Sequence, residues 1–244
     1  MAAVKDFYEY LNGIAPFETQ ENWDNSGMLV GDMNAEVTKA AVVLDITPEA
    51  VKQAKELGAN LIVSHHPVIF RAVKNVTKGS VPFELIANSI NAVCCHTPLD
   101  IAAGGTNDTL AELLGFSITV GDNPILRFAE IDETDAENLA KHIADTLGTK
   151  VRFADADKPI RKIAICTGAG SDLLDEAGDI DAFITGDAGH HDFLDALQAG
   201  KTLIAAGHYE TENPVVPVLR KKLSEEFKET EIIELKQDNP VHFI

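Results

Sequence analysis

One stretch decides the fold class of this 244-residue chain: "AAVVLDITPEAVKQAKELGANLIVSHHP", residues 40–67. Two short apolar runs flank a segment that has a helical pattern. Thr47 is expected to cap this helix, with Pro48 at its first position and Gly58 just after its last turn. A strand, a helix and a second strand in this order are the βαβ unit of a parallel sheet.

The same alternation continues to the end of the chain. Further strands are expected at 91–100, 161–170, 181–187, 201–208 and 231–236, and helices at 83–90, 106–115, 171–178, 190–200 and 218–227. The middle segment, 125–159, has the pattern of a strand, a helix, a strand and a turn. We therefore predict an α/β protein of two lobes, 1–122 and 123–244, in which mixed, mostly parallel sheets are flanked by helices.

Composition narrows the class of partner and the compartment. The chain has 39 acidic and 20 basic residues and a formal net charge of −19, so nucleic acids and anionic membranes would repel it. A small anionic substrate such as a nucleotide stays compatible where local cations or metals hold it. Three cysteines make no disulfide framework, and neither a leader nor an apolar run of about 20 residues is seen. We expect a cytoplasmic protein without a membrane partner.

Four predicted strands end in groups that can bind ligands. These ends read "LIVSHHP", "AVCCHTPLD", "DAFITGD" and "LIAAGHYETE". Binding sites of open α/β sheets gather beyond the carboxyl ends of parallel strands, where several loops converge. We therefore expect a metal site at these strand ends, between the lobes.

The adjacent histidines His65 and His66 form the first candidate pair. In a regular strand they would point to opposite faces and could not both hold one ion, whereas a pair of ions resolves the difficulty. Pro67 keeps His66 extended and favours projection of both imidazoles from the strand end. The alternative is structural, with one ring in the core and the other in solvent.

Asp100, His208 and Glu212 are the other candidate metal ligands. Asp100 could bridge two cations or serve as a turn residue. His208 and Glu212 are four apart, the spacing of one helical face, although the prolines at 214 and 217 leave open an irregular turn there. Together with His65 and His66 they form a nitrogen and oxygen donor set that suits zinc, iron(II) or manganese.

Several further residues have a role that the sequence alone leaves open. Asp187, at a strand end, is a candidate catalytic general base or a group that orients a ligand, and His96 could also orient one. His190 and His191 either contact substrate or begin an exposed helix. The glycine-rich "GAGS" at 168–171 resembles an anion-holding helix N-terminus. The three cysteines, Cys94, Cys95 and Cys166, are expected to be buried core thiols.

Five motifs, in order and spacing, resemble one family: "WDNSGMLVG" (23–31), "LIVSHHP" (61–67), "HTPLD" (96–100), "DAFITGD" (181–187) and "AAGHYETE" (205–212). The family is that of the NGG-interacting-factor-like dinuclear metal proteins, whose members are called GTP cyclohydrolase 1 type 2 homologues. The resemblance covers nearly the whole chain, in the short form without an inserted domain. Met28 stands where leucine is usual, a change of small packing cost.

The resemblance implies a toroidal homohexamer with a dinuclear site facing its inner cavity. The implied ligands are His65, His66, Asp100, His208 and Glu212, with Asp100 on one ion and Glu212 bridging a pair of divalent ions per subunit. Asp24 and Asn25 are implied to lie near the site.

The implied activity is metal-dependent hydrolysis, in which GTP is opened at the imidazole carbon of guanine and formate leaves. Two alternatives stay open at this point. One is a metal-dependent phosphoesterase, because paired metals also suit that reaction. The other is a non-catalytic metal-binding or regulatory ring whose ions tie the halves of the chain together.

Overall fold

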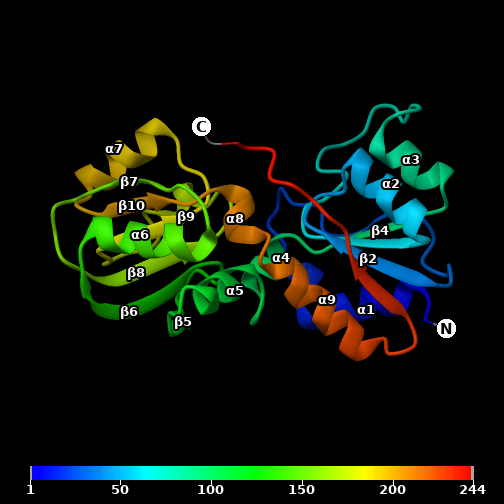
Figure 1. The fold of residues 1–244 in the computed structure, drawn as a ribbon, viewed down its shortest axis with the longest axis horizontal. Helices are drawn as coiled ribbons and strands as arrows, with labels where there is room; N and C mark the ends of the chain where they lie inside the picture. Colours follow the sequence, from blue (N-terminus) through cyan, green and yellow to red (C-terminus); the bar gives the residue numbers. More distant parts are fainter. Residues whose placement is uncertain (1, 243–244) are drawn as a thin grey trace. The chain divides into compact units, whose positions relative to one another are not determined.

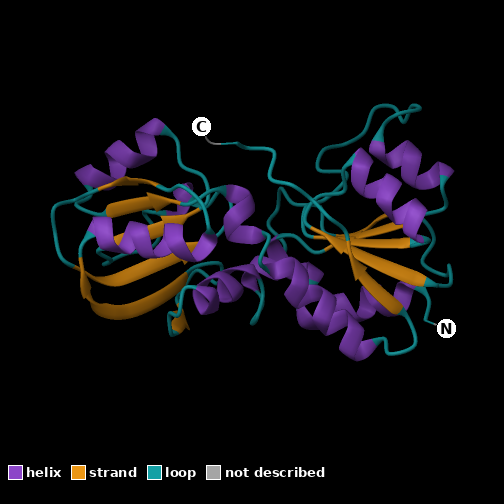
Figure 2. Ribbon diagram, in the orientation of Figure 1, coloured by secondary structure: helices purple, strands orange, loops and turns teal. Residues whose placement is uncertain are grey.

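The structure is a computed structural model that describes residues 2–242. The chain forms two compact units, Met1–Ala103 with Val216–Asp238 and Gly104–Val215 with Asn239–Ile244. Each unit has its own sheet with helices packed on it (Figures 1 and 2), which confirms the α/β class. The boundary expected at 122/123 lies inside the second unit, and the chain returns to the first unit near its end.

The first unit is built on a five-stranded sheet in the order β1-β4-β3-β2-β11. Strands β2, β3, β4 and β11 are parallel, and β1 pairs antiparallel with β4. Its strands are β1 (Gly27–Val30), β2 (Lys39–Val43), β3 (Leu61–Ser64), β4 (Asn91–Cys94) and β11 (Glu231–Glu234). Its helices are α1 (Val4–Ile14), η1 (Phe17–Thr19), α2 (Pro48–Leu57), α3 (Val81–Ala87) and α4 (Thr97–Ile101), joined by α9 (Val215–Glu226).

The βαβ unit expected at 40–67 is confirmed as β2, α2 and β3. Thr47 caps α2, because its side chain accepts a hydrogen bond from the Ala50 amide, and Pro48 is the first helical residue. Gly58 ends the helix in the left-handed conformation at φ 76°, where glycine has no Cβ to strain. Leu61, Ile62 and Val63 of β3 are fully buried, as both-face coverage of a parallel sheet requires.

The C-terminal return to the first unit follows from two apolar contacts. Ile232 of β11 lies in register with Ala40 of β2, so β11 extends the parallel sheet. Phe227, just after α9, stacks on Phe7 of α1 with ring centroids 3.8 Å apart. Both contacts join residues from opposite ends of the chain, which is why a boundary drawn along the sequence does not describe them.

The second unit has a six-stranded sheet in the order β5-β6-β8-β9-β10-β7. Only β8, β9 and β10 are parallel, and the strands on either side pair antiparallel. Its strands are β5 (Ile118–Val120), β6 (Arg127–Thr134), β7 (Arg152–Ala154), β8 (Ile160–Cys166), β9 (Ala182–Thr185) and β10 (Thr202–Ala205). Its helices are α5 (Thr106–Leu113), α6 (Ala136–Leu147), η2 (Ser171–Leu173), α7 (His190–Gln198) and α8 (His208–Glu212).

The prediction of a helix at 171–178 is wrong. Only a three-residue 3-10 turn forms, at Ser171–Leu173. Leu174 and Ala177 are buried against the sheet, and Gly178 takes a left-handed φ of 64° that turns the chain toward β9. The "GAGS" segment therefore precedes no α-helix that would hold an anion.

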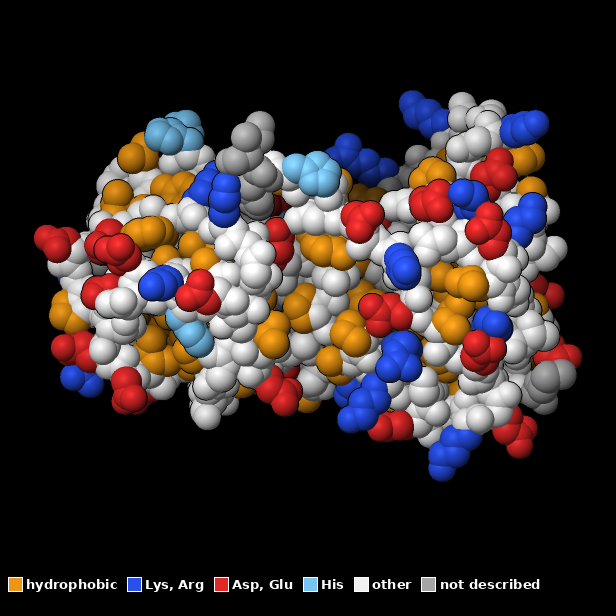
Figure 3. All heavy atoms as spheres, in the orientation of Figure 1, with side chains coloured by type: hydrophobic (Ala, Val, Ile, Leu, Met, Phe, Trp, Pro, Cys, Tyr) orange, Lys and Arg blue, Asp and Glu red, His pale blue; other side chains and the backbone are white. Residues whose placement is uncertain are grey.

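Two further features bear on the expected partners. No helix within residues 2–242 combines the length and the apolar character that a membrane span needs. Acidic side chains are scattered over the face shown in Figure 3, in keeping with the net charge of −19.

Candidate metal-binding site

In the first unit, strand register brings three histidines together. Ser64 of β3 pairs with Cys94 of β4, so the residues that follow each strand emerge side by side. One ligand atom from each of His65, His66 and His96 lies within 4.8 Å of the others. The rings of His65 and His66 have centroids 4.9 Å apart, so the expected divergence to opposite faces is not observed. The reason is that β3 ends at Ser64, and strand alternation does not extend to the histidines.

Hydrogen bonds fix which ring nitrogen of His65 and His66 is available. The His65 Nδ1 lies 3.1 Å from the Cys95 carbonyl oxygen, and the His66 Nδ1 lies 2.7 Å from Asp45 Oδ1. Both oxygens only accept, so each neutral imidazole carries its proton on Nδ1 and keeps the lone pair on Nε2. A histidine that binds a metal through one ring nitrogen usually donates a hydrogen bond from the other, which fixes the orientation of the ring.

His96 has the same support, from a buried carboxylate. Its Nδ1 lies 2.7 Å from Asp24 Oδ1, and Asp24 Oδ2 accepts bonds from the Thr97 hydroxyl at 2.5 Å and the Ser26 hydroxyl at 3.0 Å. Burial by itself raises the pKa of Asp24, but the hydrogen bonds from His96 and Thr97 outweigh it and hold the pKa well below its usual range. Asp24 is therefore a fixed negative charge beneath the histidine cluster.

Asp100 faces the same cluster. It lies on the short helix α4, which begins directly after His96. Its Oδ1 is 3.6 Å from His65 Nε2, the nitrogen that holds the lone pair. The first unit thus places three imidazoles together and a carboxylate beside one of them, which are donors that suit a divalent transition metal.

In the second unit, His208 and Glu212 form a second donor pair. Both lie on the one-turn helix α8, so they share a helical face despite the prolines that follow. Pro214 instead falls between α8 and α9. His208 Nε2 is 3.0 Å from Glu212 Oε2, and the Glu212 side chain is buried.

Asp187 supports His208 in the way that Asp45 supports His66. Thr185 of β9 pairs with Ala205 of β10, which brings the two following loops together. Asp187 Oδ2 lies 2.7 Å from His208 Nδ1, while Nε2 lies 3.0 Å from Glu212 Oε2, so both ring nitrogens of His208 face carboxylate oxygens. The predicted catalytic role of Asp187 stays a prediction, whereas its position is that of a residue that orients His208.

Two glycines make room for Glu212 and α8. A Cβ on Gly168, which has φ 62°, would lie 2.0 Å from Glu212 Oε1. A Cβ on Gly186 would lie 2.9 Å from the His208 Cα and 2.7 Å from the Thr211 hydroxyl. The "GAGS" segment thus serves to pack the Glu212 carboxylate.

The sequence did not single out Asp45, although a signal was present. Asp45 follows "AAVVL" at the carboxyl end of β2, which is a fifth strand end with a polar group. Because Asp45 lies two positions before the helix cap at Thr47, the sequence is equally consistent with a turn residue. Gln237, whose side chain donates to Asp45 Oδ2 at 2.7 Å, is 192 positions away and could not be recognised from spacing.

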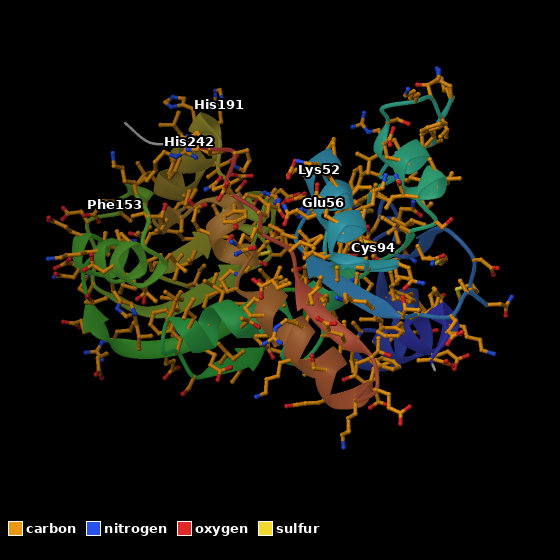
Figure 4. The ribbon with its side chains drawn as sticks, turned by 45° about the vertical axis from the view of Figure 1, so that its right-hand side comes forward. Lys52, Glu56, Cys94, Phe153, His191 and His242 are labelled. Carbon is orange, nitrogen blue, oxygen red and sulfur yellow. The ribbon has the colours of Figure 1, made fainter. Side chains whose placement is uncertain are left out.

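The remaining candidates, His190, His191 and the three cysteines, are not among the groups of side chains in residues 2–242 that could hold a metal ion. His190 and His191 begin α7 on the exposed surface, and His191 extends from the helix in Figure 4. Cys94, Cys95 and Cys166 are buried, as expected of core thiols, and Cys94 lies within β4 (Figure 4). Burial raises the pKa of the Cys94 and Cys95 thiols, which disfavours the thiolate that a metal requires.

Comparisons with known proteins agree with the motifs. The chain matches the family described as Duf34/NIF3 (NGG1p interacting factor 3) over residues 2–240. A GTP cyclohydrolase 1 type 2 homolog of Clostridium perfringens is 36% identical over 258 residues, covering 99% of this chain and 95% of the relative. The GTP cyclohydrolase 1 type 2 of Helicobacter pylori is 31% identical over 217 residues, covering 87% and 88%.

Solved structures agree as well. The hypothetical protein SA1388 of Staphylococcus aureus has a TM-score of 0.91 at 28% identity, covering 99% of both chains. Reduced HcgD from Methanocaldococcus jannaschii has a TM-score of 0.85 at 26% identity, covering 97% of this chain and 98% of that one.

Proposed function

Because the chain belongs to the Duf34/NIF3 (NGG1p interacting factor 3) family, we propose that it holds about two divalent metal ions, zinc, iron or manganese. The proposed ligands are His65, His66, Asp100, His208 and Glu212, with Asp100 on one ion and Glu212 bridging.

The observation that carries the proposal is the orientation of the histidines. His65, His66 and His208 each place Nδ1 against an acceptor oxygen, so in all three rings Nε2 is the nitrogen that would face a metal ion. His96 has the same arrangement and lies within ligand distance of the first pair, so it is a further donor or a neighbouring proton carrier.

The proposed reaction class is hydrolysis. Bound divalent ions would supply Lewis acidity and lower the pKa of a coordinated water. The chain's own residues hold the donors in place: Asp45 orients His66, and Asp187 orients His208. The relatives' names favour GTP as the substrate, with opening of the guanine imidazole ring and release of formate. We propose further that the chain acts in the cytoplasm as a ring-shaped homohexamer. Light scattering of the purified protein tests the hexamer.

The test is to incubate metal-loaded protein with GTP and to measure formate and phosphate separately. Formate without phosphate supports the cyclohydrolase reaction, and phosphate alone supports a phosphoesterase. The absence of both products supports a non-catalytic metal-binding ring. Glu212→Gln should lose metal and any turnover, since an amide replaces the carboxylate donor. Glu56→Gln, a change of the same kind on the exposed face of α2 (Figure 4), is the matched control and should retain both.

A further inference from the structure

Two aromatic side chains stand exposed on the first unit. Trp23 is 57% exposed and Phe70 is 46% exposed, and their ring centroids are 5.8 Å apart at an interplanar angle of 48°. Large rings that pair while still facing solvent leave part of each face free for a third ring. The pair therefore offers a platform for a planar ligand.

The platform adjoins the histidine cluster. The His96 ring packs edge-on against both aromatics, with centroids 5.8 Å from Trp23 and 6.1 Å from Phe70. The two segments are also tied together through the backbone, because Asn25 Nδ2 donates to the Ile69 carbonyl oxygen at 2.5 Å. A ring placed on this platform would lie beside the proposed metal ligands of the same unit.

The segment that carries Phe70 is basic in an otherwise acidic chain. Residues 57–83 contain no aspartate or glutamate, whereas the whole chain has a net charge of −19. Arg71, Lys74 and Lys78 fall in this segment, all three exposed and none paired with a carboxylate of residues 2–242. Figure 3 shows basic side chains over the loop that precedes α3, whose place in the fold is seen in Figure 1. A cluster of unpaired cations attracts phosphate groups.

We propose that Trp23 and Phe70 bind the base of a nucleotide and that Arg71, Lys74 and Lys78 bind its phosphates. The inference rests on the proposed function for its small anionic substrate, and it assigns the residues that recognise that substrate. A base has a planar π-face that stacks on indole and phenyl rings, and the phosphate chain supplies the negative charge that the segment complements. Neither half of the arrangement alone would select a nucleotide over a free base or over polyphosphate.

Trp23 makes the test direct, because it is the only tryptophan of the chain. Full-length protein, with its indole excited selectively, is titrated with GTP, guanosine and tripolyphosphate. GTP and guanosine should quench the fluorescence, and tripolyphosphate should compete with GTP without quenching. Phe70→Leu should weaken the binding of both GTP and guanosine by about tenfold, the usual scale for one lost stacking partner.

The cations are tested with a triple variant. The variant combines Arg71→Gln, Lys74→Gln and Lys78→Gln. It should bind GTP about tenfold or more weakly and bind guanosine with unchanged affinity. Matched controls remove equivalent groups elsewhere: Phe153→Leu, an exposed ring of the second unit that is labelled in Figure 4, and the triple change Lys52→Gln, Lys141→Gln and Lys228→Gln. Both controls should bind as the unmodified protein does.

The outcomes separate this inference from the metal proposal when metal content is measured on the same samples. Metal-loaded protein whose fluorescence none of the guanosine compounds changes would overturn the nucleotide site and leave the metal site standing. Metal-free protein that still shows the pattern above would support the nucleotide site and count against the metal proposal. Equal weakening in the test and control variants, at unchanged thermal stability, would also overturn the assignment.

Discussion

Gly168→Ala tests whether the glycine makes room for the Glu212 carboxylate. Gly168 has φ 62°, where a residue with a Cβ loses about 1–2 kcal/mol, and its Cβ would lie 2.0 Å from Glu212 Oε1. Relieving that contact by displacement of a buried side chain costs a further 1–3 kcal/mol or so. The free energy of unfolding should therefore fall by about 2–5 kcal/mol in total.

Gly178→Ala is the matched control, because Gly178 has φ 64° and a Cβ at that position would meet no other atom within 4 Å. It should lose only the backbone contribution. At roughly 2–4 °C of melting temperature per kcal/mol for a chain of this size, the control falls by about 2–8 °C and Gly168→Ala by a further 2–12 °C or so. Calorimetry measures both, and elemental analysis should show loss of metal in Gly168→Ala alone. Equal melting temperatures and equal metal contents of the two variants would refute the reasoning.

Three further perturbations test the support of the site. Asp24→Asn replaces a buried acceptor of several hydrogen bonds by an amide that leaves a donor unsatisfied. The free energy of unfolding, measured by denaturant titration, should therefore fall by about 1–3 kcal/mol. The exposed Asp132→Asn should leave it unchanged, and equal stabilities of the two variants would contradict the network. Asp187→Asn should weaken metal binding by about 10–100-fold in chelator competition with little change in melting temperature, and unchanged affinity would show that Asp187 does not orient His208. In native protein the three cysteines should resist a thiol reagent that modifies all of them after unfolding, because they are buried; rapid native labelling would contradict this burial.

The sequence predicts most of the local structure and little of what joins distant segments. Thr47, Pro48 and Gly58 act within one helix, and their roles follow from local chemistry that is visible in the sequence. The pairing of β11 with β2 depends on a contact between residues at opposite ends of the chain, which no local pattern specifies. At residues 171–178 the local pattern predicts a helix that does not form, because burial of this segment and a left-handed glycine override the pattern.

The candidate site divides in the same way. The donors stand at strand ends, where the chemistry of parallel sheets places them, so they could be picked out from the sequence. Asp187 and His96 could also be named as groups that orient a ligand. The pairing of Asp24 with His96 and of Asp45 with His66 could not be predicted, because these partners are 72 and 21 positions apart. The close approach that makes Gly168 necessary depends on the fold itself.

Elemental analysis of protein purified without chelator tests the central claim most directly. The account predicts about two divalent ions per chain, lost in His66→Ala and in Glu212→Ala but kept in Cys95→Ala, whose buried thiol takes no part. A chain that carries no divalent metal, or ligand variants that keep the full metal content, would contradict it.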